Sequence, residues 1–553
     1  MSKNNESMNR RKFLEAGIGS AAGAALMGGL PSFLSAHEEA ALPSSDEIFG
    51  WVEDMYNFGK ADRYGYRMPG TKSDKQNAEY LLAKFQKFGL KNTKLEPVPE
   101  AVAFPDAWKL TVGAGGKEEE IPCYFLRYAG FTTAAGVSAP MVYVGKGRSE
   151  DFAKVDAKGK IVVGDVTGEG FRVPLPQSAH NLSMNYDQFS KNWPNTFYTY
   201  DPDNTLANDK NSENWPPDFG AYQGAVKAGA AGFVGILENM AGDMNQFLHW
   251  YGKYELPAVS IGPRSGARLR KMLADGSTEG KIVLTGTKGQ ENTYNIYGFV
   301  PGKNEDEIVV VQSHHDGWTV NEATGAATVL GLAKYFGQLP PKTLDRTLMF
   351  FLVGSHFGTR APWEGTGGPQ DRLGNNRLGN MSTEDATKLY NLKPGWDKFV
   401  GMAEQLTSKV VCANNIEMVG GKQYKRSGDD FVATGLVSPP MFAVTGPTAD
   451  EPNPALLSFV RDAVEKNKIN RANVLPQFIG EARHWGPMGF PMVHHISFNA
   501  WQFTSNDTPD TVMKEALAPM VAAFSEIIRA EISVDAAKLK PVANYMESKT
   551  QVG

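Results

Sequence analysis

The stretch VVVQSHHD, residues 309–316, decides the fold class and locates a candidate site. Its run of valines predicts a buried strand. This strand delivers His314 and Asp316 at its carboxyl end, where ligands collect in open α/β sheets. A histidine two residues from a carboxylate suits a metal ligand and the acidic group that orients it. Spacing alone equally allows a buried histidine stabilised by the aspartate beside it.

Strand and helix patterns alternate through the second half of the chain. Apolar runs predict strands at 308–312, 347–353, 410–413 and 492–497. Helices are expected at 326–336 and, with a long apolar stripe, after Pro509. We therefore expect an α/β protein with a mixed, mainly parallel sheet flanked by helices on both faces.

The first half of the chain has a different pattern of expected helices, strands and loops. Ser44 and Ser73 are expected to cap two helices, the second of which ends at Gly89. Residues 137–290 carry short strand patterns, glycines and one helix pattern. Within this range, the polar and aromatic-rich segment 171–219 is expected to be a loop near a binding cleft.

Composition excludes several classes of function. The 553 residues include 56 basic and 61 acidic side chains, a net charge of −5, so no global basic field favours nucleic acid. The only two cysteines, Cys123 and Cys412, rule out a Cys-rich metal site, and we expect both thiols to be unpaired and buried. No apolar stretch of the mature chain is long enough to span a membrane.

The N-terminus carries a targeting pattern. The stretch NRRKFL, residues 9–14, precedes an apolar, Gly/Ala-rich run over residues 16–30. This pattern predicts a twin-arginine signal peptide, residues 1–36, and export of the folded protein to the periplasm or the medium. The alternative is an ordinary amphipathic first helix.

Four polar side chains stand at or just past predicted strand ends: His314, Asp316, His356 and Glu417. In a doubly wound sheet these positions converge on one edge. Two imidazoles and one carboxylate suffice to hold one divalent metal ion with a position open for water or substrate. We expect zinc, with iron or manganese as alternatives, because imidazole and carboxylate suit all three metals.

Several motifs along the chain carry a resemblance to a known family. They are GYRMPG at 65–70, KGKIV at 158–162, AGAAG at 228–232, YNIYGFVPGK at 294–303 and TSNDTPD at 504–510. In this order they resemble the zinc aminopeptidases and glutamate-carboxypeptidase-like metallopeptidases, which include the transferrin receptor. The resemblance covers nearly all of the mature chain. It implies a catalytic domain formed by residues 44–136 and 291–553, with a protease-associated domain inserted at 137–290.

The family's site implies two metal ions held by five side chains, and part of that set is retained. His314 matches the first ligand histidine and Asp316 the aspartate that supports it. His356 stands at a ligand glutamate and Glu417 at a ligand aspartate, so both positions keep groups that can bind metal.

The remaining positions depart from the family's pattern. Asn321 stands where an aspartate bridges the two metals, Ser355 where a glutamate acts as base, and Phe503 where a histidine is a ligand. These exchanges argue against a two-zinc mechanism. We therefore predict a rebuilt site in which His314, His356 and Glu417 hold one ion, with Asn321 as a weak neutral fourth ligand.

A general base is still needed. The candidates, in order, are His484, Glu322 and His315. His484 lies in a stretch that resembles the family's Asp-His-Trp motif lining the cleft, and Glu322 adjoins the altered bridge as a base or a ligand. Alternation on a strand places His494 and His495 on opposite faces, and both are interpreted as structural.

The resemblance implies hydrolysis of a peptide, an N-acyl amino acid or another small amide. Arg483, Trp485 and Phe503 are the expected substrate-binding residues. Two alternatives remain open. One is a metal-dependent lyase, hydratase or isomerase acting on a small molecule outside the cytoplasm, and the other is a metal-free binding protein of the same fold. A homodimer is also left open.

Overall fold

The computed structural model divides at residue 40, into residues 1–39 and 40–553. It describes residues 41–114, 117–127, 129–167, 170–172, 199–200, 202, 213–215, 220–245, 256–276, 278–354, 356, 409–445, 452–475, 482 and 491–539. The predicted signal peptide and the stretch around His484 lie outside these residues. Everything described below belongs to the second unit.

A large mixed sheet organises this unit, as the sequence predicts. Its strands follow the order β3-β10-β9-β5-β4-β11-β13-β12-β14-β19-β17-β18-β7, with β1 paired to β11 and β2 to β1. The first part comprises β3 (Tyr124–Phe125), β10 (Ala258–Ile261), β9 (Gly232–Leu237), β5 (Ile161–Val166) and β4 (Val137–Tyr143). The second comprises β13 (Arg346–Val353), β12 (Asn304–His314), β14 (Val410–Ile416), β19 (Met492–Ile496), β17 (Met441–Val444), β18 (Ala472–Leu475) and β7 (Thr199–Tyr200).

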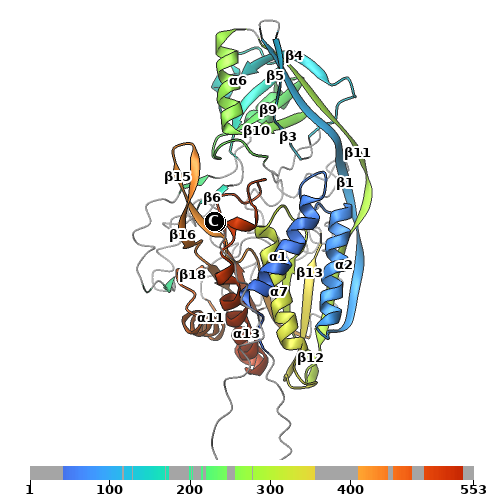
Figure 1. The fold of residues 1–553 in the computed structure, drawn as a ribbon, viewed down its shortest axis with the longest axis vertical. Helices are drawn as coiled ribbons and strands as arrows, with labels where there is room; N and C mark the ends of the chain where they lie inside the picture. Colours follow the sequence, from blue (N-terminus) through green and yellow to red (C-terminus); the bar gives the residue numbers. More distant parts are fainter. Residues whose placement is uncertain are drawn as a thin grey trace, which may run out of the picture. The chain divides into compact units, whose positions relative to one another are not determined.

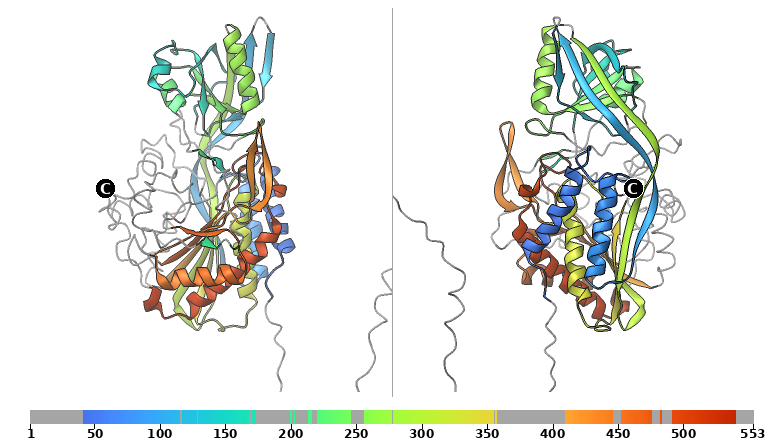
Figure 2. Two further views of the ribbon diagram at one scale, coloured as in Figure 1. Left: turned by 90° about the vertical axis from the view of Figure 1, so that its left-hand side faces the viewer. Right: turned by 45° about the vertical axis from the view of Figure 1, so that its right-hand side comes forward.

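A long two-stranded ribbon joins the two parts (Figures 1 and 2). It consists of β1 (Lys91–Ala114) and β11 (Thr278–Val300), which pair antiparallel, while β2 (Lys117–Ile121) pairs with the end of β1. One end of β11 pairs with β4 and the other with β13. Strand β11 therefore joins the strands of the inserted segment, residues 137–290, to the rest of the sheet. The boundaries of that segment as a protease-associated domain stay a prediction.

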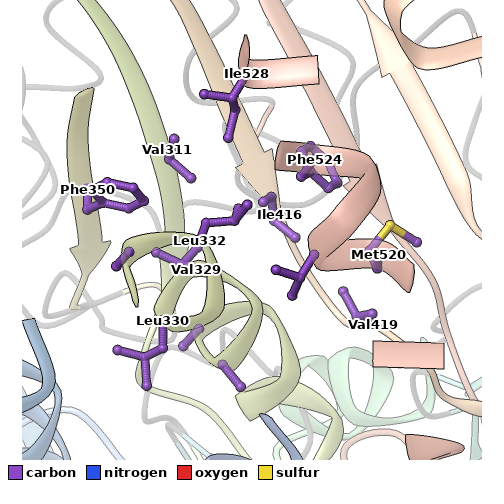
Figure 3. Packing of buried hydrophobic residues seen from close by; sticks show 14 of the residues in the cluster. Val311, Val329, Leu330, Leu332, Phe350, Ile416, Val419, Met520, Phe524 and Ile528 are labelled. Atoms are coloured by element: carbon purple, nitrogen blue, oxygen red, sulfur yellow. The ribbon is translucent and has the colours of Figure 1, made fainter. Parts of the chain in front are cut away.

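Helices cover the sheet beside β12 and β13 (Figure 1). They are α1 (Ser45–Lys60), α2 (Lys72–Lys87), α7 (Asn321–Gly337) and α13 (Leu517–Ser533), with α11 (Pro454–Lys466) packed against α13. The core between them combines aliphatic side chains of α7 and α13 with Val311, Phe350 and Ile416 of the strands (Figure 3). None of the helices in the described ranges is long and apolar enough to cross a membrane.

Shorter elements complete the described chain. They are α3 (Ser149–Phe152), α5 (Gly220–Lys227), α6 (Pro263–Asp275), the pair β6 (Gly170–Arg172) and β8 (Glu213–Trp215), the hairpin β15 (Lys422–Ser427) and β16 (Asp430–Val437), and the 3-10 turns Pro509–Thr511, Lys514–Ala516 and Ala536–Leu539. Cys123 and Cys412 are both free, as predicted, although only Cys412 is fully buried.

Two helix starts differ from the sequence prediction. The cap of α2 is Thr71, whose Oγ1 accepts from the Asp74 N–H, whereas Ser73 turns its hydroxyl to the Tyr66 carbonyl. The sequence predicted that α7 starts at Ala326, but the helix begins at Asn321. Its first turn is buried and packs as part of the helix. Its start puts the polar residues 321 and 322 on a rigid element beside the candidate site.

The parallel run β13-β12-β14-β19 positions that site. His314 pairs with Val353, Gln312 with Asn415, and Asn415 with His494. Because parallel strands end at the same edge of a sheet, residues that follow these four strands are neighbours.

Candidate functional site

His314 is held by a backbone carbonyl. Its Nδ1 lies 2.7 Å from the Asp316 oxygen, and the side chain is 1% exposed. A carbonyl oxygen can only accept, so Nδ1 carries a hydrogen and Nε2 is the nitrogen that faces the site. The sequence predicted orientation by the Asp316 carboxylate, but Oδ1 of Asp316 is 3.8 Å from Nδ1, so the tighter contact is the carbonyl.

Glu322 meets His314 at the start of α7. Its Oε2 is 3.2 Å from His314 Nε2, and its Oε1 accepts a hydrogen bond from Gln502 Nε2 at 3.0 Å. Glu322 and Gln502 are both buried. Within the described chain, Glu322 Oε2 makes no hydrogen bond. A carboxylate oxygen therefore faces an imidazole nitrogen in a site closed to water.

Asn321 lies beside this pair with its side-chain amide unsatisfied. Its backbone N–H donates to Asp507 Oδ2 at 3.1 Å, which fixes the first turn of α7. Neither amide atom of its buried side chain has a hydrogen-bond partner in the part of the chain that the structure describes. Burial raises the pKa of Asp507 to about 6, opposed by the hydrogen bonds that this carboxylate accepts.

His356 follows β13 and approaches His314. The two imidazole ring centroids are 4.7 Å apart, with the planes tilted by 34°. The structure thus brings together two of the predicted ligands, His314 and His356. Ser355 lies outside the described residues.

Glu417 follows β14 and is hydrogen-bonded by Asn415. Its Oε1 accepts from Asn415 Nδ2 at 2.5 Å, and the same amide lies 2.9 Å from His494 Nδ1. In the described residues, no group of three or more His, Cys, Asp or Glu side chains is placed to hold a metal ion. The predicted ligand set of His314, His356 and Glu417 therefore stays a prediction.

The likeness of this chain to known proteins lies in solved structures. No protein-family model matches it, and no curated protein matches it. A zinc aminopeptidase from Bacillus subtilis superposes over 90% of this chain and 98% of its own, with a TM-score of 0.55 and 17% identity. A peptidase M28 precursor from Shewanella amazonensis superposes over 90% and 99%, with a TM-score of 0.56 and 17% identity. An aminopeptidase from an Aneurinibacillus strain gives 89% and 95%, a TM-score of 0.51 and 16% identity.

The fold is that of the zinc aminopeptidases. At these identities the likeness establishes the architecture, and the chemistry must be argued from this chain's own side chains. Neither Arg483, His484 nor Trp485 lies in the described residues, so their predicted cleft positions stay predictions.

Tyr66 packs against Trp318, and Trp318 against Phe503, so that the three rings form an aromatic wall on segments that also carry His314 and Gln502. The Trp318 ring lies 4.3 Å from Tyr66 and 6.2 Å from Phe503, between centroids. Phe503 has a φ of 62° and Met418, next to Glu417, a φ of 47°. Non-glycine residues in this region cost on the order of 1–2 kcal/mol and cluster at functional sites. A substrate-binding role for Phe503 stays a prediction.

Two further histidines are structural. His315, the third candidate for the base, directs Nε2 to the Tyr294 carbonyl at 2.6 Å and Nδ1 toward Asn77. Burial lowers its pKa to about 4, so the ring is neutral and already engaged. His495 packs between Phe442 and Phe524, and burial lowers its pKa to about 3.

Sequence reasoning missed Gln502, and its interpretation of His494 as structural stays a prediction. Strand alternation places His494 on the face opposite His495, where its Nδ1 lies 2.9 Å from the Asn415 amide that also donates to Glu417. Gln502 gave no signal, because its contact with Glu322 joins residues 180 positions apart in the chain.

Proposed function

We propose that this protein is a metal-dependent hydrolase that cleaves a peptide, an N-acyl amino acid or another small amide with a single metal ion. The aminopeptidase fold supports the reaction class. The observation that carries the proposal is the 3.2 Å approach of His314 Nε2 to Glu322 Oε2. A neutral His314 with its hydrogen on Nδ1 would present Nε2 as an acceptor, and a cation between Nε2 and Oε2 would then bind both atoms.

The spacing of His314 Nε2 and Glu322 Oε2 suits one divalent ion between them. Ligand atoms about 2.0–2.2 Å from a tetrahedral ion lie roughly 3.3–3.5 Å from each other, close to the observed separation. Asn321, the residue before Glu322 in the chain, has an unsatisfied amide oxygen that would add a neutral donor, and His356, whose ring lies 4.7 Å from that of His314, would add an imidazole. A second ion is not supported, because Asn321 is a poor bridge and Phe503 cannot bind metal.

When bound, such a metal polarises a substrate carbonyl and lowers the pKa of a bound water. The chain's own residues do the rest. The Asp316 carbonyl fixes the His314 tautomer, and Gln502 fixes one oxygen of Glu322. Burial of His314 and Glu322 excludes bulk water from their contact. Oε2 of Glu322 would be a ligand of the bound ion, and we therefore assign the base to His484.

We also propose that the protein is exported folded through the twin-arginine route and acts in the periplasm or the medium. The support is the NRRKFL stretch at residues 9–14, which is followed by an apolar run at residues 16–30. Export after folding allows the metal to be acquired in the cytoplasm, which suits a site buried as deeply as this one.

The test is elemental analysis of the purified protein and of a His314→Ala variant, followed by assays on aminoacyl anilides and N-acyl amino acids. We expect about one zinc, iron or manganese per chain, and both metal and amide hydrolysis lost in the variant, whose near-UV circular dichroism should report an intact fold. Two ions per chain would restore the ordinary two-metal site. A folded wild-type protein with no metal would overturn the proposal and favour a binding protein.

A further inference from the structure

At two positions where the family has a metal ligand, this chain has a residue that binds metal poorly or not at all. The polar residues next to these two positions in the chain contact each other. By the resemblance, Asn321 and Phe503 stand where the family has a bridging aspartate and a ligand histidine. The residue after the first is Glu322 and the residue before the second is Gln502. These two side chains form a buried hydrogen bond of 3.0 Å beside His314. Each substitution that removed a ligand is thus accompanied by a polar group one position away.

Gln502 is oriented by its surroundings. Its Nε2 donates to Glu322 Oε1 and also lies 2.8 Å from Met418 Sδ, both of which are acceptors. The amide therefore presents NH₂ to the carboxylate, while its Oε1 has no hydrogen-bond partner in the described residues. A buried amide with one end unsatisfied lowers stability. A packing role alone would be served better by an apolar side chain of the same size.

The backbone on both sides of this amide is also constrained. Met418 adopts a φ of 47° and Phe503 a φ of 62°, so the thioether and the Gln502 side chain are presented from strained turns. On the other side, Asp507 accepts the Asn321 N–H and fixes the first turn of α7, which carries Glu322. Each partner of the Gln502–Glu322 hydrogen bond thus adjoins a residue whose backbone is in a rare conformation or is fixed by a side-chain hydrogen bond.

We propose that Glu322 replaces the carboxylate missing at position 321 as the metal ligand, and that Gln502 is the residue that positions it. By occupying Oε1, Gln502 leaves Oε2 as the oxygen that faces the cation and His314 Nε2. This inference rests on the proposed function, because it assumes that an ion binds between these atoms. It places Gln502 outside direct contact with metal, acting through Glu322.

The experiment measures zinc affinity on protein stripped with a chelator, by competition with a zinc-sensitive dye. Gln502→Met keeps the volume and removes the donor, and Glu322→Gln removes the charge of the ligand. The control is Gln423→Ala, which deletes another buried amide, bonded to Arg471 at 2.9 Å. Cobalt substitution gives a second readout, because its visible absorption reports the geometry of the ligands and not the stability of the fold.

We expect zinc binding about 10–100-fold weaker in Gln502→Met, a typical loss for a residue that supports a ligand. Its cobalt spectrum should change, and Glu322→Gln should bind more weakly still. Gln423→Ala should match the wild type in both readouts. Wild-type affinity and spectrum in Gln502→Met, with weakened binding in Glu322→Gln, would overturn the positioning role and leave the proposed function intact. Unchanged binding in Glu322→Gln would overturn the ligand assignment, and a wild type that binds no zinc would overturn both.

Discussion

At the scale of the residue, Glu531 is an unusual acid in the core beneath the sheet. It lies on α13, fully buried, where Oε2 accepts from Asn414 Nδ2 at 2.6 Å and Oε1 from Cys412 Sγ at 3.2 Å. Burial raises its pKa to about 7, and the two hydrogen bonds only partly oppose this shift. The folded protein therefore keeps a proton on Glu531 at a pH where the unfolded chain has lost it.

This difference in pKa predicts a stability that falls as pH rises. Between the ordinary pKa of 4.5 and the folded value of about 7, the unfolded state binds fewer protons, so the free energy of unfolding decreases with pH and then levels off. The total effect is about 3 kcal/mol. Glu531→Gln should make this slope shallower in urea titrations run from pH 5 to 8. Glu526→Gln, a part-exposed position on the same helix, should retain it, and an unchanged slope in Glu531→Gln would contradict the assignment.

Single residues of the site could be predicted from the sequence only where a local pattern, such as an apolar run, marks the strand end at which they stand. His314 and His356 follow runs of buried apolar residues, so the end of each strand was visible in the sequence. The partner of Glu322 was not visible, since Gln502 lies in an irregular turn that only tertiary packing brings to α7. The orienting group of His314 is a carbonyl, and a carbonyl is carried by every residue and leaves no trace in a sequence.

At the scale of the element, the start of α7 depends on a carboxylate from a distant turn. Asp507 Oδ2 accepts from the Asn321 N–H and the Thr319 hydroxyl, while Oδ1 accepts from Thr511 Oγ1 at 2.6 Å and Asn499 Nδ2 at 3.3 Å. The side chain thus satisfies donors from two segments at once. Without it these donors stay buried and unpaired.

Asp507→Ala should therefore lower the free energy of unfolding by about 3 kcal/mol, since each buried unsatisfied donor costs about 1–3 kcal/mol and the turn can relax in part. Urea denaturation followed by tryptophan fluorescence measures the loss. Asp510→Ala, at an exposed position three residues on, should change stability by less than about 0.5 kcal/mol. Equal effects of the two changes would show that Asp507 does not hold the helix start.

The elements that the sequence predicted well are those buried on both faces. The strands at residues 308–312 and 347–353 were predicted within a few positions, because continuous apolar runs between turns have few other interpretations. The ribbon strands β1 and β11 were missed. Many of their side chains are polar and exposed, and β1 contains prolines at 97, 99 and 105, which normally argue against a strand. A two-stranded ribbon tolerates them because one edge of each strand needs no ladder partner.

At the scale of the whole described unit, one strand and one set of side chains join the two parts of the sheet. Strand β11 pairs with β4 at one end and β13 at the other. The hydrophobic core of the inserted segment also includes the aromatic wall, Tyr66, Trp318 and Phe503. The inserted segment is thus part of what holds this wall in place, and its loss of structure would remove the packing behind that wall.

This sharing predicts that the two parts unfold together. Phe233 is fully buried in β9 and packs edge-on against Tyr222, far along the chain from the site. Phe233→Ala should lower stability by about 3–5 kcal/mol. Native-state hydrogen exchange then discriminates. If unfolding is cooperative, the amides of β12 at residues 309–311 lose protection by the same free energy as those of β9. If only the β9 amides lose protection, the inserted segment opens independently, and the shared core does not couple it to the site.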